Sequence, residues 1–341
     1  MQIILALCLV YSKEICNMKF ARFTFIFFIA MVMAPFVNAQ VAAFPRGPVT
    51  LVVPFPPGGP TDAMARVLAQ RLGDRLGQQV LIDNKGGAGG SIAAEAVAKA
   101  APDGQTLFFG TTGTMAINPS LYTKLRYDPI KDFAPVSLMA TTMNVLVVNP
   151  EVPARNLGEL IKLAKSKPDT LSYGSAGNGS SNHLSGELLR SSAGLQISHI
   201  PYKGSAPALV DLLGGRLTMM FDTIAQQTGN ISTGKLRALA VTGPKRSPLL
   251  PDVPTAQEAG IKDFDVTIWF GVLAPAGTPT PVIDRLSKEI AAVMNAEDMK
   301  KRMQADGAEA RPSTPSEFAA LIRSDMAKWT PIVKASGATI D

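Results

Sequence analysis

Short apolar segments and amphipathic segments alternate along most of the chain. Residues 49–55 (VTLVVPF) are almost entirely apolar, which predicts a buried strand, and residues 62–77 have apolar positions at helical spacing. The apolar face of this helix consists of Met64, Val67, Leu68, Leu72 and Leu76. Two further predicted strands, 79–83 and 106–110, flank a predicted helix of small residues over 91–100. Two successive β–α–β units predict an α/β fold, with a parallel sheet and helices on both faces.

The alternation resumes in the middle of the chain. Strand-like and helical patterns follow one another through 144–150, 156–168, 171–175, 183–194, 197–202, 206–216, 217–221 and 235–243. Two longer strand-like stretches, 133–150 and 264–275, could each carry the chain across a domain boundary. Helical patterns over 282–296 and 316–335 follow, whereas residues 247–260 have no periodicity.

The start of the chain has the pattern of a secretory signal peptide. From Met18, two basic residues precede an apolar run over 23–33, and the small residues Val37-Asn38-Ala39 predict cleavage after Ala39. The alternative is a membrane anchor, but an apolar run of about a dozen residues is short for a bilayer span. Residues 1–17 suggest an upstream start that is not used, with Met18 as the true start. We therefore expect a soluble exported protein.

Composition narrows the chemistry that is available. The chain has 341 residues, 46% of them hydrophobic and 18% charged, which is enough for two domains. Both cysteines, Cys8 and Cys16, precede Ala39, so the cleaved chain of 302 residues would have no thiol, disulfide or lipid-anchored cysteine. The chain also has only two histidines, and its basic residues are scattered. We therefore expect no metal site, no cofactor and no nucleic-acid partner.

Glycine-rich polar loops follow several of the predicted strands. They lie at 54–62 (PFPPGGPTD), 110–114 (GTTGT), 174–183 (GSAGNGSSNH) and 201–207 (PYKGSAP). In open α/β sheets, ligands bind beyond the carboxyl ends of the strands, where helix N-termini present N–H groups and a partial positive charge. Any one of these loops could equally serve only to reverse the chain. Together they indicate an anion-binding site.

Catalytic patterns are poorly represented. The loop 86–90 (GGAGG) follows the second strand and does not match the dinucleotide-binding glycine pattern, and the residues around Ser175 do not form a nucleophile elbow. A serine hydrolase that uses Ser175 or Ser180 with His183 can be drawn, although no spacing requires it. His199 lies within a predicted strand and is interpreted as a structural residue.

The loops together resemble a known family. The segments PFPPGGPTD, NKGGAGG, APDGQTLFFGTTGTMAINPSLY, YGSAGNGSSNHLSGELL, PYKGSAPALVDLLGGRLTMMFD and GKLRALAVTGPKRSPLLPDVPTAQEAG are similar, in order and spacing, to those of the Bordetella uptake gene (Bug) family. Members of this family are extracytoplasmic solute receptors of tripartite tricarboxylate transporters. The resemblance covers about residues 44–338.

The resemblance implies a type II periplasmic-binding-protein fold, in which two lobes close on a ligand in a central cleft. Lobe one would comprise residues 43–142 and 266–341, and lobe two residues 143–265. A small carboxylate would be bound by backbone N–H groups, hydroxyls and waters. The residues implied are Phe55, Pro57, Gly58, Gly59, Thr111, Thr112, Ser175, Ala176, Gly177, Asn178, Ser180 and Asp222.

Three positions qualify this picture. Many relatives have glycine at the position of Pro60 and histidine at that of Met115, so the resemblance implies a more apolar wall around Met115. Proline suits a first helical turn, because its missing N–H would have no partner there. Asp62 would repel an anion, so we expect its carboxylate to cap its own backbone.

The resemblance implies a receptor without enzymatic activity. It would be a monomer that captures a carboxylate and delivers it to the membrane subunits of a tripartite tricarboxylate transporter. A ligand-binding module of a membrane sensor kinase remains an alternative, as does the exported hydrolase. The sequence does not identify the carboxylate.

Overall fold

The computed structural model describes residues 44–340, and the predicted signal peptide with its two cysteines lies outside this range. The first half of the described chain contains β1 (Val49–Val53), α2 (Pro60–Leu76), β2 (Val80–Asn84), η1 (Ala88–Gly90), α3 (Ser91–Ala98), β3 (Thr106–Thr111), η2 (Gly113–Ile117), α4 (Asn118–Leu121), β4 (Phe133–Val148), α5 (Leu157–Ser166) and β5 (Ser172–Ser175). The second half contains α6 (Ser181–Ala193), β6 (Ser198–Pro201), α7 (Ser205–Leu213), β7 (Met219–Thr223), α8 (Ile224–Ser232), β8 (Arg237–Val241), β9 (Thr267–Pro275), α9 (Thr280–Met294), α10 (Glu297–Ala305), β10 (Ala308–Ala310) and α11 (Pro315–Ser336).

The strands form one mixed sheet in the order β2-β1-β3-β9-β4-β7-β5-β6, with β8 and β10 also paired to β4. The neighbours of β1 and of β5 are parallel, as the β–α–β pattern predicts. Strands β4 and β9 are antiparallel to each other and to their other partners. The predicted parallel pairing is therefore confirmed for the β–α–β units, and the sheet is mixed because two long strands outside those units lie between the parallel groups.

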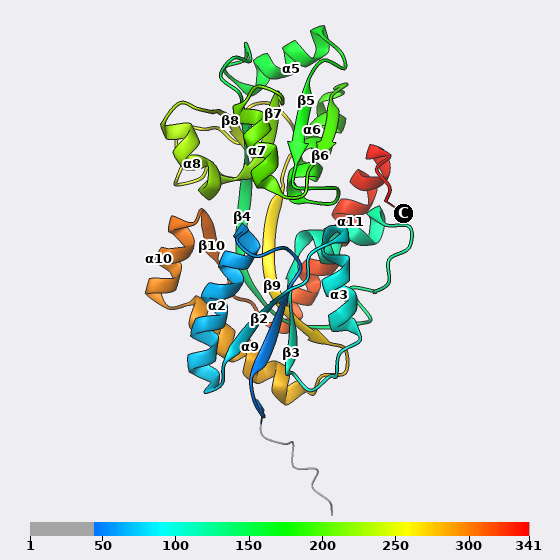
Figure 1. Ribbon diagram of the computed structural model, residues 1–341, viewed down its shortest axis with the longest axis vertical. Helices are drawn as coiled ribbons and strands as arrows, with labels where there is room; N and C mark the ends of the chain where they lie inside the picture. The colour runs from blue at the N-terminus through cyan, green and yellow to red at the C-terminus, as the bar shows by residue number, and fades with distance from the viewer. Residues whose placement is uncertain (1–43, 341) are drawn as a thin grey trace, which may run out of the picture. The chain divides into compact units, whose positions relative to one another are not determined.

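Strand β4 changes partners halfway along its length. Up to Met143 it pairs with β9, and from Asn144 it pairs with β7 and β8. Figure 1 shows β4 and β9 running between the elements around α2, α3 and α9 and those around α5 to α8. The predicted lobe boundaries at 142/143 and 265/266 lie within two residues of this change of partners. The division into two lobes stays a prediction.

One buried threonine forms hydrogen bonds to β4 and to the residue before β9, and we call these two strands the crossing strands. Thr242 follows β8, and its N–H donates to the Asn144 carbonyl while its hydroxyl accepts the Asn144 N–H, each at 2.9 Å. The same hydroxyl donates to the carbonyl of Val266, whose N–H donates to the Thr242 carbonyl. Val266 immediately precedes β9, so Thr242 fixes the spacing of β4 and β9 where they leave each other.

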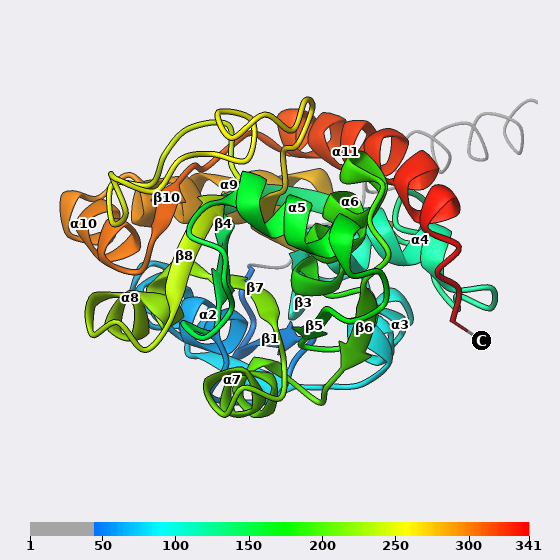
Figure 2. The same cartoon turned by 90° about the horizontal axis from the view of Figure 1, so that it is seen from above.

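The longest helix joins two parts of the core. Helix α11 begins with a capping box between Thr314 and Glu317 and continues past an internal proline. Its Trp329 is 1% exposed and belongs to a hydrophobic cluster that also includes Leu121 of α4 and Leu188 of α6. Figure 2 shows α11 running alongside α6 toward α4. This cluster therefore crosses the predicted boundary between the lobes.

Most predicted elements have their expected type. The apolar face of α2 is buried as predicted at Met64, Leu68, Leu72 and Leu76, while Val67 is half-buried. Pro60 is the first residue of α2, where its ring is tolerated. The sequence analysis missed α8 and α10, which are short and mostly polar. Within the described residues, no helix has the length and apolarity needed to span a bilayer.

Thr242→Val should lower the free energy of unfolding by about 1–3 kcal/mol, because the buried Asn144 N–H would lose its acceptor. Thr242→Ser keeps the hydroxyl and should cost much less. Urea denaturation followed by circular dichroism measures both variants. Equal stability of the two variants would show that the hydroxyl does not hold the crossing strands.

Candidate ligand-binding site

The predicted site residues lie at or just beyond the carboxyl ends of four strands. Phe55 to Gly59 follow β1, Thr111 ends β3 and Thr112 follows it, Ser175 ends β5 and residues 176–180 follow it, and Asp222 is near the end of β7. Their exposure differs widely. Pro57, Gly58 and Asn178 are exposed, whereas Thr111, Thr112, Ser175 and Asp222 are buried.

The loop after β1 is held by the carboxylate of Asp62. Gly58 has φ +86°, a conformation that favours glycine, and its N–H donates to Asp62 Oδ2 at 2.9 Å. Arg66 Nε donates to the same oxygen, and Asn84 Nδ2 donates both to Asp62 Oδ1 and to the Phe55 carbonyl. Asp62 therefore binds the backbone of its own chain, as expected. The N–H that it binds belongs to Gly58, which precedes α2. The N-terminus of α2 has no side-chain cap.

The balance of interactions at Asp62 favours its charged form. Burial raises the pKa of this carboxyl, but the hydrogen bonds from Arg66, Gly58 and Asn84 outweigh that effect and hold the pKa below its ordinary value. The negative charge is therefore matched by three donors within the protein. The repulsion that an anion would experience near this residue is reduced accordingly.

The loop 86–90, which the sequence analysis set aside, supports two of the predicted segments. A side chain at Gly90 would lie 2.8 Å from Pro54 and 2.6 Å from Thr114, so only glycine fits between them. A Cβ at Gly86 would come within 3.2 Å of the Pro56 ring. The sequence carried a signal for this role in its four glycines, but nothing in it indicated which segments they would touch.

The hydroxyls at the end of β3 are engaged with the protein. Thr111 and Thr114 exchange hydrogen bonds between backbone and side chain, which fixes the turn into η2. Thr112 Oγ1 accepts the N–H of Trp269 in β9 at 2.8 Å, and the indole of Trp269 donates to Asp325 of α11 at 2.6 Å. Met115, implied as part of a ligand wall, is instead fully buried in a hydrophobic cluster, because its side chain fills the core beside Gly110.

The loop after β5 is closed by its own serines. Ser175 Oγ accepts the Gly177 N–H at 3.1 Å, and Ser180 Oγ donates to the Gly177 carbonyl at 2.6 Å. Ser180 is also the N-cap of α6, since its hydroxyl accepts the N–H of His183. Ala176 and Gly177 are half-buried between these anchors.

The two histidines stack beneath this loop. His199 Nε2 lies 2.7 Å from Ser175 Oγ, and the rings of His183 and His199 are 4.1 Å apart. His183 Nδ1 accepts the N–H of Gly179 at 3.2 Å. The proposed pairing of His183 with a catalytic serine was therefore misplaced. The histidine beside Ser175 is His199, because the parallel register of β5 and β6 pairs Tyr173 with His199 and places its ring on the side of Ser175.

Asp222 is 1% exposed and both of its oxygens accept hydrogen bonds from the protein. The donors are Gln227 Nε2 at 2.6 Å, Asn182 Nδ2 at 3.2 Å and the Thr223 N–H at 2.9 Å. Asn182 also donates to the Phe221 carbonyl, so it connects α6 to the end of β7. The sequence analysis missed Asn182, although its position next to the GSAGNGSS loop is a signal that could have found it.

Backbone contacts bring the predicted segments together. A Cβ at Gly179 would lie 2.8 Å from Leu121 and 3.1 Å from Asn118, and one at Gly113 would lie 3.3 Å from the Gly179 carbonyl. The loop after β5 thus lies against η2 and α4, which follow β3. Because Gly90 in turn joins Pro54 to Thr114, the ends of β1, β3 and β5 form one neighbourhood.

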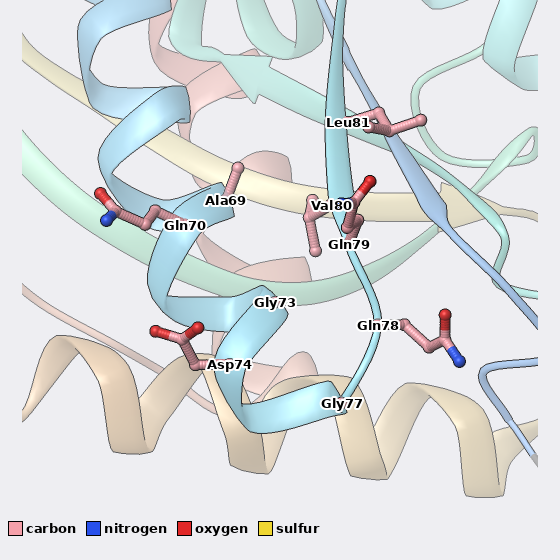
Figure 3. Close-up of a pocket in the computed structure, with 9 residues that line it drawn as sticks. All are labelled: Ala69, Gln70, Gly73, Asp74, Gly77, Gln78, Gln79, Val80 and Leu81. Carbon is pink, nitrogen blue, oxygen red and sulfur yellow. The ribbon is translucent and has the colours of Figure 1, made fainter.

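A pocket lies at the C-terminal end of α2, whereas the predicted ligand loop after β1 lies at its N-terminal end. Figure 3 shows it between the last turns of α2 and the start of β2. Its lining consists of Ala69, Gln70, Gly73, Asp74, Gly77, Gln78, Gln79, Val80 and Leu81. None of the predicted site residues belongs to this lining. In the part of the chain that the structure describes, His, Asp and Glu side chains do not gather in a group of three that could hold a metal ion.

The fold is that of periplasmic binding proteins, a class with two lobes. A Rhodopseudomonas palustris protein solved with adipate is 39% identical, with a TM-score of 0.82 over 87% of this chain and 100% of its own. MatC from Rhodopseudomonas palustris, solved with bound malate, is 37% identical, with a TM-score of 0.79 over 85% of this chain and 100% of its own.

Residues 64–338 match the family described as the tripartite tricarboxylate transporter family receptor, and the chain belongs to this family. The protein BugT of Bordetella pertussis is 38% identical over 89% of this chain and 94% of its own length. The resemblance to Bug proteins and the predicted type II fold are thereby confirmed. The twelve predicted ligand contacts stay predictions.

The raised pKa of Asp222 predicts how the stability of the protein depends on pH. Burial raises this pKa from its ordinary 3.8 to about 6, while the hydrogen bonds from Gln227, Thr223 and Asn182 act in the opposite direction. Since the folded-state pKa lies above the unfolded one, the contribution of Asp222 to stability is complete below pH 3.8 and is lost as the pH rises through about 6.

The stability of the wild type relative to Asp222→Asn should therefore fall by on the order of 2 kcal/mol between pH 4 and pH 7. Denaturant unfolding of both proteins at several pH values measures the difference. A difference that stays constant with pH would contradict the raised pKa.

Proposed function

We propose that this chain is a periplasmic receptor that captures a small organic carboxylate. The observation that carries the proposal is that two relatives at 37% and 39% identity, aligned over most of this chain, were solved with malate and adipate. The ligand would lie among the strand-end loops, in contact with members of the predicted set from Phe55 to Asp222.

The chemistry of the loops supports an anion. Helix α2 begins without a side-chain cap, and its Pro60 has no N–H while the Ala63 N–H donates to the Gly59 carbonyl. The N–H groups of Thr61 and Asp62 would therefore be available to a ligand, and the helix dipole favours negative charge there. None of the predicted contact residues is an arginine or lysine. The Gly59 N–H and the hydroxyl of Thr112, which accepts the Trp269 N–H and can still donate its own proton, would supply further polar contacts. Asp222, with both oxygens occupied, would act by holding Asn182 and the end of β7.

The proposal also covers where the protein acts and what it delivers its ligand to. The first 39 residues would direct export and be removed after Ala39, and the monomeric receptor would pass its ligand to the membrane subunits of a tripartite tricarboxylate transporter. Closure of two lobes around β4 and β9 would trap the ligand, because the closed state makes more contacts with it. A role as the ligand-binding module of a sensor kinase would use the same site and differ only in the partner.

Binding without turnover is favoured over hydrolysis. Ser175 lies 2.7 Å from His199, but no carboxylate is bonded to that histidine among the hydrogen bonds of the described residues. The nearest carboxylate of the stack, Glu187, accepts from Tyr173 and pairs with Arg190. The pair therefore lacks the acid that orients and stabilises a catalytic histidine.

The binding prediction can be tested with two glycines that flank α2, Gly58 and Gly77. Gly58 and Gly77 both have positive φ and open space around the position of a side chain, but Gly58 precedes the helix and Gly77 ends it. Each change to alanine should cost about 1–2 kcal/mol of stability from backbone strain. Only Gly58→Ala should weaken carboxylate binding, because only its strain acts on the loop at the N-terminus of α2.

A thermal-shift screen with adipate, malate and a wider carboxylate library identifies the ligand. A hundredfold excess over the dissociation constant should add about 2.7 kcal/mol of stability. Titration calorimetry then compares the two glycine variants. Equal loss of affinity in Gly58→Ala and Gly77→Ala would place the ligand elsewhere.

The absence of turnover has a separate test. The wild type and Ser175→Ala should hydrolyse p-nitrophenyl acetate equally slowly, and a bound carboxylate should be recovered unchanged after long incubation. Hydrolysis by the wild type that disappears in Ser175→Ala would favour the exported hydrolase instead.

A further inference from the structure

Two stacked imidazoles hold both ends of the loop after β5. His199 Nε2 contacts Ser175 Oγ at the start of the loop, and His183 Nδ1 accepts the N–H of Gly179 near its end. Their rings are 4.1 Å apart and inclined by 25°. The loop segment between these anchors contains Ala176, Gly177 and Asn178, three of the predicted ligand contacts.

The stack continues into the core of the protein. The ring of Tyr173 lies 4.9 Å from that of His199, and its hydroxyl donates to Glu187 at 2.6 Å. Glu187 is paired with Arg190 at 2.8 Å. Tyr173 and His183 are at most 3% exposed, so the column cannot tilt without disturbing packed neighbours. The loop is therefore attached to a rigid support through its two histidines.

The hydrogen bond to Gly179 defines the protonation state of His183. Because Nδ1 accepts the Gly179 N–H, it carries no proton, and the ring is neutral with its proton on Nε2. A proton on Nδ1 would place two donors face to face at 3.2 Å. It would also put a positive ring 4.1 Å from a second imidazole.

The surroundings favour the neutral form of both rings. Burial lowers the pKa of His183, while Glu187 raises it and Arg190 lowers it. Burial and the neighbouring His183 lower the pKa of His199 to about 3. Glu187 and Arg190, both in α6, and the stacked rings are the titratable groups that act on the two histidines. Tyr173 remains neutral because burial and Glu187 raise its pKa.

We propose that His183 and His199 are positioning residues for the ligand loop, and that protonation of His183 releases Gly179 and weakens ligand binding. This inference rests on the proposed function, since it assumes that the loop binds a carboxylate. The residues act through the loop backbone and make no contact with the ligand. Because the neutral state is required, affinity is full at neutral pH and falls on acidification.

The first experiment needs no ligand. The chain has only two histidines, so labelled imidazole nitrogens give two sets of signals that can be followed by NMR from pH 8 to pH 4. His183 should have a midpoint below the ordinary value of 6.5, and His199 should stay neutral over this range because its pKa is lowered to about 3. The amide signal of Gly179 should move with the midpoint of His183. A Gly179 amide that does not follow His183, or a His183 midpoint at or above 6.5, would overturn the proposal.

The second experiment compares two substitutions at one position. In His183→Asn the amide oxygen can take the place of Nδ1 as an acceptor that does not titrate, whereas His183→Phe keeps the stacking and removes the acceptor. With adipate or malate as the probe, the dissociation constant of the wild type should rise about tenfold for each pH unit below the His183 midpoint. In His183→Asn the dissociation constant should not show this additional rise at low pH. Titration of adipate or malate itself affects both proteins equally, so it cancels when their pH profiles are compared.

His183→Phe should bind at least tenfold more weakly at pH 7, with circular dichroism confirming that it is folded. If His183→Phe does not fold, the pH profiles of the wild type and His183→Asn decide. Identical pH profiles in these two proteins would refute the release step. If neither probe binds to any protein, the proposed function is in question, but the coupling of Gly179 to His183 is still decided by NMR.

Discussion

Hydrogen bonds from polar side chains to the loop backbone are the interactions on which the site depends. A site without arginine or lysine has only peptide dipoles, hydroxyls and waters to offer an anion, and dipoles stabilise charge well only when they are already oriented. Asp62 fixes Gly58, Ser175 fixes Gly177, and Ser180 fixes the first turn of α6. These side chains fix the backbone geometry of the predicted ligand loops.

The arrangement of the strands places limits on how two lobes can move. Thr242 binds both crossing strands, and the cluster around Trp329 includes residues from both sides of the predicted boundary. A rigid-body rotation must therefore either leave the Thr242 hydrogen bonds intact and bend the strands beyond them, or slide α6 against α11. Both motions act on side chains that are fully packed, so two discrete arrangements are favoured over a continuous series.

The order of strands and helices could be predicted because each β–α–β unit has its own periodicity. The position of β9 and β4 between the parallel groups could not, since it depends on pairings between residues more than seventy positions apart. Helices α8 and α10 were missed because their stability comes from packing and not from a broad apolar face. The loops of the candidate site were predicted from their glycine, serine and threonine content, and their role as ligand contacts stays a prediction. Their supports, such as Asn84 and His199, lie in neighbouring strands whose register the sequence does not reveal.

The contact between Thr112 and Trp269 connects the loops to the mechanics of the whole molecule. Thr112 is itself one of the predicted ligand contacts, Trp269 belongs to β9, and Asp325 is on the helix that spans both parts of the core. A displacement of Thr112 by a fraction of an ångström would act directly on the peptide of β9 and, through the indole, on α11. Any movement of the loop after β3 is therefore shared with two elements that lie far from it in the sequence.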